Sequence, residues 1–157
     1  MLLKTDNIIL DILLEAQSNG NTLLKPFHIQ HPSKRIMEES NSIFVACVSS
    51  ENLDDGYDFS TFKDLVEILI VTKQLDYSEA IELIKGITIE ICRLLMINQD
   101  RFPNKPTIRS INPEFNRDYV LTRGHIMVQV KTSPTDFSLS EEDYNVCSVI
   151  LDKIEID

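Results

Sequence analysis

The chain has 157 residues, of which 43% are hydrophobic and 25% charged, a composition typical of one folded domain. Acidic side chains outnumber basic ones by 25 to 15, and the net charge of -10 disfavours binding to the phosphate backbone of DNA or RNA. No run of about 20 apolar residues is present, so we expect no transmembrane helix; the first residues do not resemble a signal peptide.

The first predicted element is an amphipathic helix from Asp6 to Ser18. Thr5 or Asp6 is expected to cap its start, and the Asn19-Gly20-Asn21 turn is expected to end it. Apolar side chains gather on one face, which we expect to pack in the core: Ile8, Ile9, Ile12, Leu13 and Ala16.

A β-hairpin is predicted next. Phe27 to Ile29 is compatible with a short strand, and residues 32–41 are predicted to form a loop. Ser42 to Ser49 and Phe62 to Lys73 are rich in β-branched and other apolar residues, which favours two strands. The turn predicted at residues 52–56 lies between them, so we expect the two strands to pair.

The strongest predicted element is a long helix from Asp76 to Asn98, with Asp76 as the cap. Its polar residues recur every three or four positions in one narrow stripe: Glu79, Glu82, Gly86, Glu90 and Arg93. A helix lying on a sheet needs an apolar stripe of only about 100°. The apolar part of this helix is wider, so we expect a second partner besides the sheet, either the N-terminal helix or a neighbouring subunit.

The later strands complete the predicted sheet. One begins at Thr107 and is expected to break at Pro113. Another runs from Tyr119 to Thr132, where the apolar alternation slips and predicts a bulge or bend near Gly124.

This order of elements predicts an α+β fold, in which an antiparallel sheet packs against one long central helix plus an N-terminal helix. We expect a single domain over residues 1–157, with residues 134–157 as an acidic C-terminal extension. Residues 146–156 are predicted as a last strand, with a helix starting at Ser140 as the alternative.

No residue pattern points to catalysis. Cys47, Cys92 and Cys147 each lie in an apolar run and are expected to be free thiols that pack as small hydrophobic groups. His28 and His31 lack further ligands at zinc spacing. Glycine-rich phosphate loops and a Gly-x-Ser-x-Gly motif are absent from the sequence. We therefore predict no catalytic residue, no metal and no cofactor.

Charged residues segregate along the chain, which is compatible either with solvated faces or with complementary patches that meet between identical subunits. In the second interpretation the candidate interface combines basic and apolar residues: Arg109, Arg117, Arg123, Lys131, Met96 and Ile89.

The size and order of elements resemble the tail-terminator, or tail-completion, proteins of long-tailed phages and prophages. The resemblance covers the helix at Leu3–Ser18, the hairpin strands Ser42–Ser49 and Phe62–Lys73, the helix Asp76–Ile97 and the strands within Thr107–Thr132. It implies a non-enzymatic virion protein that forms a ring, usually of six subunits. Such a ring caps the tail tube and joins it to the head connector.

The resemblance also implies an acidic lumen through which DNA slides, and a location in the virion or the host cytoplasm without membrane contact. The candidate lumen residues come from two acidic runs: Asp54, Asp55, Asp58, Glu141, Glu142 and Asp143. An alternative function is a cytoplasmic adaptor or regulatory domain that binds a protein partner through a sheet edge; an enzyme of unknown type is a third class. A ring predicts a closed oligomer, whereas an adaptor predicts a monomer or a two-fold dimer.

Overall fold

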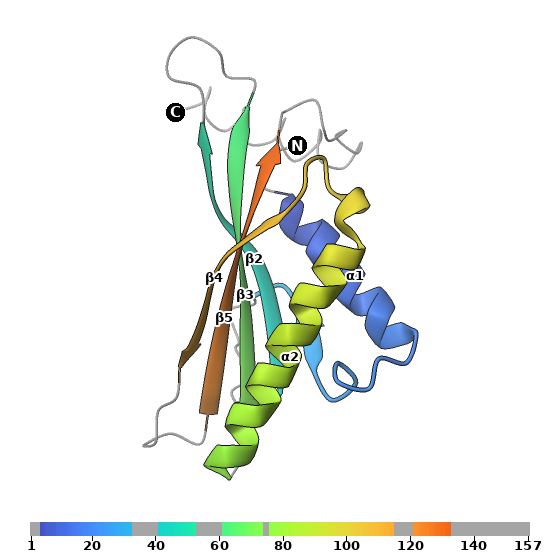
Figure 1. The fold of residues 1–157 in the computed structure, drawn as a ribbon, viewed down its shortest axis with the longest axis vertical. Helices are drawn as coiled ribbons and strands as arrows, with labels where there is room; N and C mark the ends of the chain where they lie inside the picture. The colour runs from blue at the N-terminus through green and yellow to red at the C-terminus, as the bar shows by residue number, and fades with distance from the viewer. Residues whose placement is uncertain (1–3, 33–40, 53–60, 74–75, 115–120, 133–157) are drawn as a thin grey trace, which may run out of the picture.

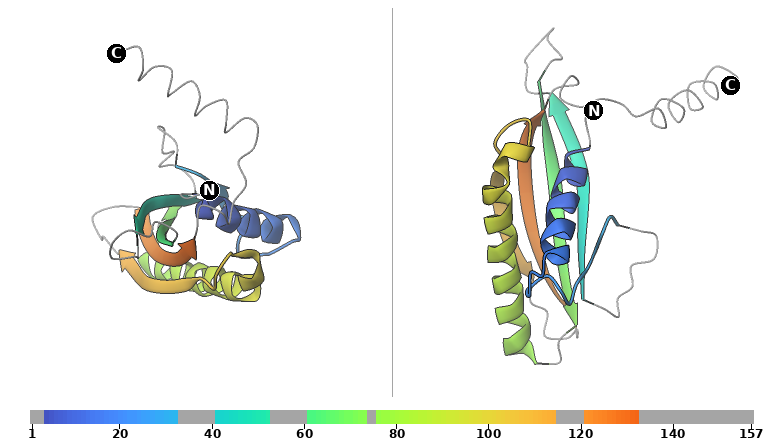
Figure 2. Two further views of the ribbon diagram at one scale, coloured as in Figure 1. Left: turned by 90° about the horizontal axis from the view of Figure 1, so that it is seen from above. Right: turned by 90° about the vertical axis from the view of Figure 1, so that its right-hand side faces the viewer.

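The computed structural model describes residues 4–32, 41–52, 61–73, 76–114 and 121–132. The elements in chain order are α1 (Thr5–Ser18), β1 (His28–Gln30), β2 (Ser42–Asn52), β3 (Phe62–Lys73), α2 (Tyr77–Ile97), the short 3-10 turn η1 (Gln99–Arg101), β4 (Thr107–Glu114) and β5 (Leu121–Thr132). Five strands form one sheet in the order β1-β2-β3-β5-β4 (Figure 1). Both helices pack on the same face of this sheet (Figure 2). The predicted α+β fold, with a long central helix and an N-terminal helix, is confirmed.

The sheet is mostly antiparallel. β2 and β3 pair as the predicted hairpin, with Val45 opposite Ile68, and β3 pairs in turn with β5. The exception is β1, which runs parallel to β2 and places Ile29 beside Ile43. Residues 53–56 of the predicted turn between β2 and β3 lie outside the described residues, as do residues 33–40 of the predicted loop. The whole segment 134–157, with the element predicted at residues 146–156, also lies outside them.

The core lies between the sheet and the two helices. Val66 and Ile68 of β3 face Val128 and Ile126 of β5, and none of the four side chains is exposed to solvent. The helix-facing positions of both strands alternate with positions on the opposite face, as expected for a sheet covered on one side. α1 contributes to this core the apolar face predicted from its periodicity, with Ile9, Ile12 and Leu13 buried.

The start of α1 differs from the prediction. The helix begins at Thr5, its cap position is Lys4, and no side chain caps it by a hydrogen bond. Thr5 is fully buried, and its hydroxyl donates instead to the Asp64 carboxylate of β3 at 2.6 Å. The Thr5 side chain, which the sequence pattern predicted to cap the helix, therefore forms a tertiary hydrogen bond with Asp64 instead.

α2 begins as predicted. The Asp76 side chain accepts hydrogen bonds from the backbone N–H groups of Ser78 and Glu79, at 2.8 and 3.3 Å. At the other end, the Asn98 side chain donates to the Leu94 carbonyl at 2.8 Å. Besides the sheet, α2 contacts α1, so the N-terminal helix is a second partner of its wide apolar surface. The buried residues of α2 are Ala80, Ile84, Ile87, Thr88, Ile91, Leu94 and Leu95.

The predicted bulge at Gly124 is wrong. β5 pairs with β3 without a register shift, and Gly124 is a regular, buried, helix-facing position. A Cβ atom at this position would lie 2.9 Å from Cγ2 of Ile84 on α2. The glycine therefore permits the close approach of α2 to β5.

Pro113 does not end β4, contrary to the prediction. The strand continues to Glu114, and Pro113 pairs with Gly124 of β5. Proline is tolerated here because β4 lies at the end of the sheet, where one side of a strand needs no hydrogen-bonded neighbour. Two register shifts occur elsewhere, at Cys47–Ser49 in β2 and at Ile108–Ser110 in β4.

Candidate functional site

The residues of the predicted interface do not form one patch. Ile89 and Met96 lie on α2, and Ile89 is 69% exposed. Arg123 and Lys131 alternate along β5 with side chains that are buried under the helices, so they point to the opposite face of the sheet. Arg109 of β4 reaches that face too, because it donates to the Gln129 side chain at 2.9 Å.

The remaining interface residue, Arg117, lies outside the described residues. So do all of the candidate lumen residues, which are Asp54, Asp55, Asp58, Glu141, Glu142 and Asp143.

The sheet face opposite the helices is mixed in charge. The two ring nitrogens of His125 face carboxylates on both neighbouring strands, Glu67 of β3 at 2.9 Å and Glu114 of β4 at 3.5 Å. Lys63 pairs with Glu51 at 3.2 Å. Acidic groups therefore accompany the basic ones on this face, which does not provide the uniformly positive track that a nucleic-acid backbone requires.

The outer face of α2 combines apolar and charged side chains. Ile89 and Ile97 are 69% and 60% exposed, so the face predicted as a narrow polar stripe carries two large hydrophobic residues as well. Lys85 pairs with Glu82 at 3.6 Å along the same helix. No described segment lies over this face in the views of Figures 1 and 2.

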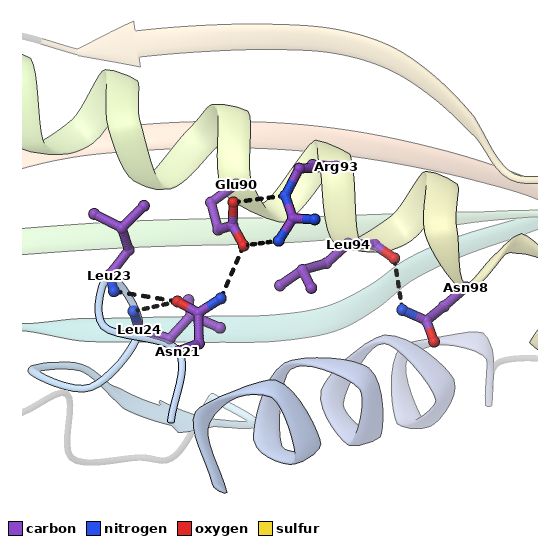
Figure 3. A network of polar contacts seen from close by, with 7 residues as sticks. All are labelled: Asn21, Leu23, Leu24, Glu90, Arg93, Leu94 and Asn98. Carbon is purple, nitrogen blue, oxygen red and sulfur yellow. Dashed lines mark hydrogen bonds and ion pairs between the residues drawn. The ribbon is translucent and has the colours of Figure 1, made fainter. Parts of the chain in front are cut away.

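Glu90 links this outer face to the loop that follows α1 (Figure 3). Its carboxylate accepts from the Asn21 side chain at 2.8 Å and from Nε of Arg93 at 2.9 Å. The hydrogen bond from Arg93 lowers the pKa of Glu90. Asn21 also accepts from the backbone N–H groups of Leu23 and Leu24, so Glu90 is held in place and Arg93 is kept on the outer face.

β4 is an exposed edge of the sheet that the described residues form. It is eight residues long, and most of its side chains are exposed, including the apolar Ile111 at 49%. The edge at the other side of the described sheet, β1, has only three residues. The longer edge, β4, can accept a further strand from another chain. Pro113 confines regular pairing there to residues 107–112, because proline cannot donate a hydrogen bond.

A buried polar cluster joins α1 to the sheet. The Asp64 carboxylate accepts from Thr5 and from Ser50 of β2, both at 2.6 Å, and has no solvent exposure. Asp64 was not singled out in the sequence analysis. Its position in β3 could have indicated burial, because Asp64 lies two residues before Val66 and therefore on the same buried face of the strand as Val66 and Ile68.

The same cluster contains Cys47, whose chemistry agrees with the predicted inert thiol. Burial raises the pKa of Cys47 to about 12, and the Asp64 and Asp6 carboxylates act in the same direction. A protonated thiol is a poor nucleophile and metal ligand. In the described part of the chain, no three His, Cys, Asp or Glu side chains are placed to bind a metal ion.

No family model matches the sequence, and no curated protein sequence matches it significantly. Among the described helices, none combines the length and the apolar character needed to cross a membrane.

Proposed function

We propose that this protein is a non-enzymatic assembly protein of the tail-terminator type, which closes into a ring by binding further copies of itself. The observation that carries the proposal is the pair of unlike sheet edges, the long exposed β4 and the short β1, at opposite ends of one sheet. A ring needs a contact between two different surfaces of each subunit, and such edges supply them.

The resemblance then supplies the setting of this ring, at the end of a tail tube and beside the head connector. The net charge of -10 suits a lumen that DNA traverses without binding.

The exposed Ile111 of β4 provides a direct test. Ile111→Asp places a charge on the proposed contact, whereas Leu14→Asp changes an exposed apolar residue of α1 that lies on neither sheet edge, 37% exposed against 49%. We expect light scattering to find a closed oligomer for the wild type and for Leu14→Asp, and a strongly reduced mass for Ile111→Asp. Negative-stain microscopy should show rings. A monomer or a dimer at every concentration and salt level would contradict the ring.

A second candidate function is the adaptor, because the edge of β4 at residues 107–112 also suits a short extended peptide from a different protein. In that function the chain remains a monomer or a two-fold dimer, and Ile111→Asp lowers binding of the partner without changing the mass of the free protein.

A further inference from the structure

α2 carries a line of outward residues at the spacing of a helix-packing seam. Its positions follow each other at alternating steps of three and four residues, as in the contact line of paired helices. All six positions are exposed or only partly buried. This outer seam consists of Glu79, Glu82, Gly86, Ile89, Arg93 and Met96.

Gly86 has no function within the monomer that the structure accounts for. Glycine in the middle of a helix lowers its stability relative to alanine. A Cβ at Gly86 would meet no atom within 4 Å among the described residues, so packing inside the molecule does not require its absence. One step along the seam, Ile89 is a large apolar side chain that is 69% exposed. A small position beside a protruding one is what a closely packed second helix requires.

The seam is complementary to itself in the antiparallel direction. With a two-fold axis beside Ile87 and Thr88, Gly86 of each copy faces Ile89 of the other. The same axis places the acidic Glu82 opposite the basic Arg93. A parallel pair would instead place each charged position opposite the identical one, which like-charge repulsion disfavours. Because both halves of the match lie on one seam, the partner that fits it is a second copy of this chain.

The ion pairs within each helix support this arrangement. Lys85 pairs with Glu82, and the Glu90 carboxylate, held by Asn21, fixes Arg93 on the outer face. In the antiparallel pair, Lys85 and Glu90 lie on opposite sides of the seam and do not meet. The charge contact between the copies is therefore the one between Glu82 and Arg93, which occurs once at each end of the central Gly86–Ile89 packing.

We propose that two copies of the chain pair through the outer seam of α2 in an antiparallel, two-fold contact, with Ile89 of each copy packed over Gly86 of the other. This contact uses a different surface from β4. A chain that forms both contacts assembles into two rings joined face to face, whereas a chain that forms only the seam contact is a dimer.

Charge exchange across the seam tests the proposal on the full chain. Glu82→Arg alone brings two guanidinium groups against each other across the contact, and Arg93→Glu alone brings two carboxylates together. Each variant should therefore pair at least about tenfold more weakly than the wild type. In an equimolar mixture of the two variants, a heterodimer has opposite charges at both ends of the contact. The two substituted positions meet at one end, and the native Arg93 faces the native Glu82 at the other. Each variant paired with itself instead has like charges at both ends. Sedimentation equilibrium should then find heterodimers with clearly higher affinity than either variant has for itself.

Gly86→Gln provides a second, independent measurement. Because nothing described lies above Gly86, we expect the substitution to raise the denaturant midpoint of the fold, since glutamine is the better helix former. It should also weaken pairing at least about tenfold by filling the space that Ile89 occupies. Val48→Ala, on an exposed residue of β2, should leave pairing unchanged. If Arg93→Glu fails to fold by circular dichroism, Glu82→Arg and Gly86→Gln decide the question.

The outcomes separate this inference from the proposed function. A doubled ring that the variants split into single rings, or a dimer that they split into monomers, supports the seam contact. Rings of unchanged mass in all variants overturn the seam contact and leave the ring function intact. A wild type that never pairs, or a mixture that does not recover pairing, also overturns it.

Discussion

Asp64 is a carboxylate without solvent exposure at the place where α1 meets the sheet. Hydroxyl donors from two other elements, Thr5 and Ser50, satisfy one oxygen each at 2.6 Å. Burying a charged group without partners costs several kcal/mol, so these hydrogen bonds are needed for the site to form. The cluster consequently fixes how α1 is docked, and it determines the environment of the neighbouring Cys47.

The thiol of Cys47 should react slowly in the folded protein. With its pKa raised to about 12, the thiolate fraction near neutral pH is about a thousandfold lower than for an ordinary thiol of pKa 9.0. Alkylation followed by peptide mass spectrometry should show protection of Cys47 in the native state and rapid labelling in denaturant. The native rate should continue to rise with pH above 9.0, because the folded thiol is still protonated there. A native rate that levels off at pH 9.0 would contradict the raised pKa.

At the scale of elements, α2 approaches β5 closely at Gly124. A Cβ there would lie 2.9 Å from Ile84 Cγ2, a methyl group that can move away only if the buried, β-branched side chain changes its χ1 rotamer. The position of α2 over the sheet, and thus the direction of its outer seam, depends on this glycine.

Gly124→Ala should lower the free energy of unfolding by about 1–3 kcal/mol through overpacking. Gly86→Ala is the matched control: open space surrounds it among the described residues, so we expect a gain of up to about 1 kcal/mol from helix propensity. Urea denaturation measures both. Because Ile84→Ala removes the obstructing methyl, its combination with Gly124→Ala should cost less than the sum of the two single changes. Strict additivity would contradict the clash.

The elements themselves were largely predictable, because their determinants are local. β3 has the predicted bounds, and α2 has the predicted Asp76 cap, since alternation and capping are encoded in neighbouring residues. The errors involve partners distant in sequence. Thr5 bonds Asp64, which is 59 positions away, and Gly124 accommodates Ile84 of another element. Asn21 and Glu90 are 69 positions apart, so local patterns could not pair them.

The candidate contact surfaces were predictable only in part. The apolar excess on α2 indicated a second partner, and exposed Ile89 belongs to that excess. The alternation of β5 could have placed Arg123 and Lys131 away from the helices, but the layer in which Ile89 lies depends on how α2 packs on the sheet. The division of the predicted interface between two layers is therefore a property of the tertiary structure.

For the whole molecule, hydrogen exchange should follow the strand order. Amides of the central strands β3 and β5 should exchange most slowly, and those of the edge strands β1 and β4 most rapidly. If copies associate through the β4 and β1 edges, exchange in residues 107–114 and in β1 should slow as protein concentration rises, while exchange in the central strands β3 and β5 changes less. Mass spectrometry of peptic peptides measures both effects. Exchange in β4 that is independent of concentration under conditions of oligomer formation would contradict its part in the contact.

The pairing of β3 with β5 also has a consequence for how the chain folds. These neighbours in the centre of the sheet are not a hairpin, since α2 and β4 lie between them in sequence. During synthesis, β4 therefore emerges before the strand that must hold it on the sheet. Until residue 132 has left the ribosome, the sheet is incomplete and the apolar side of α2 lacks part of its cover, so we expect slow folding dominated by long-range contacts. The nascent chain is most exposed to misassociation in that interval.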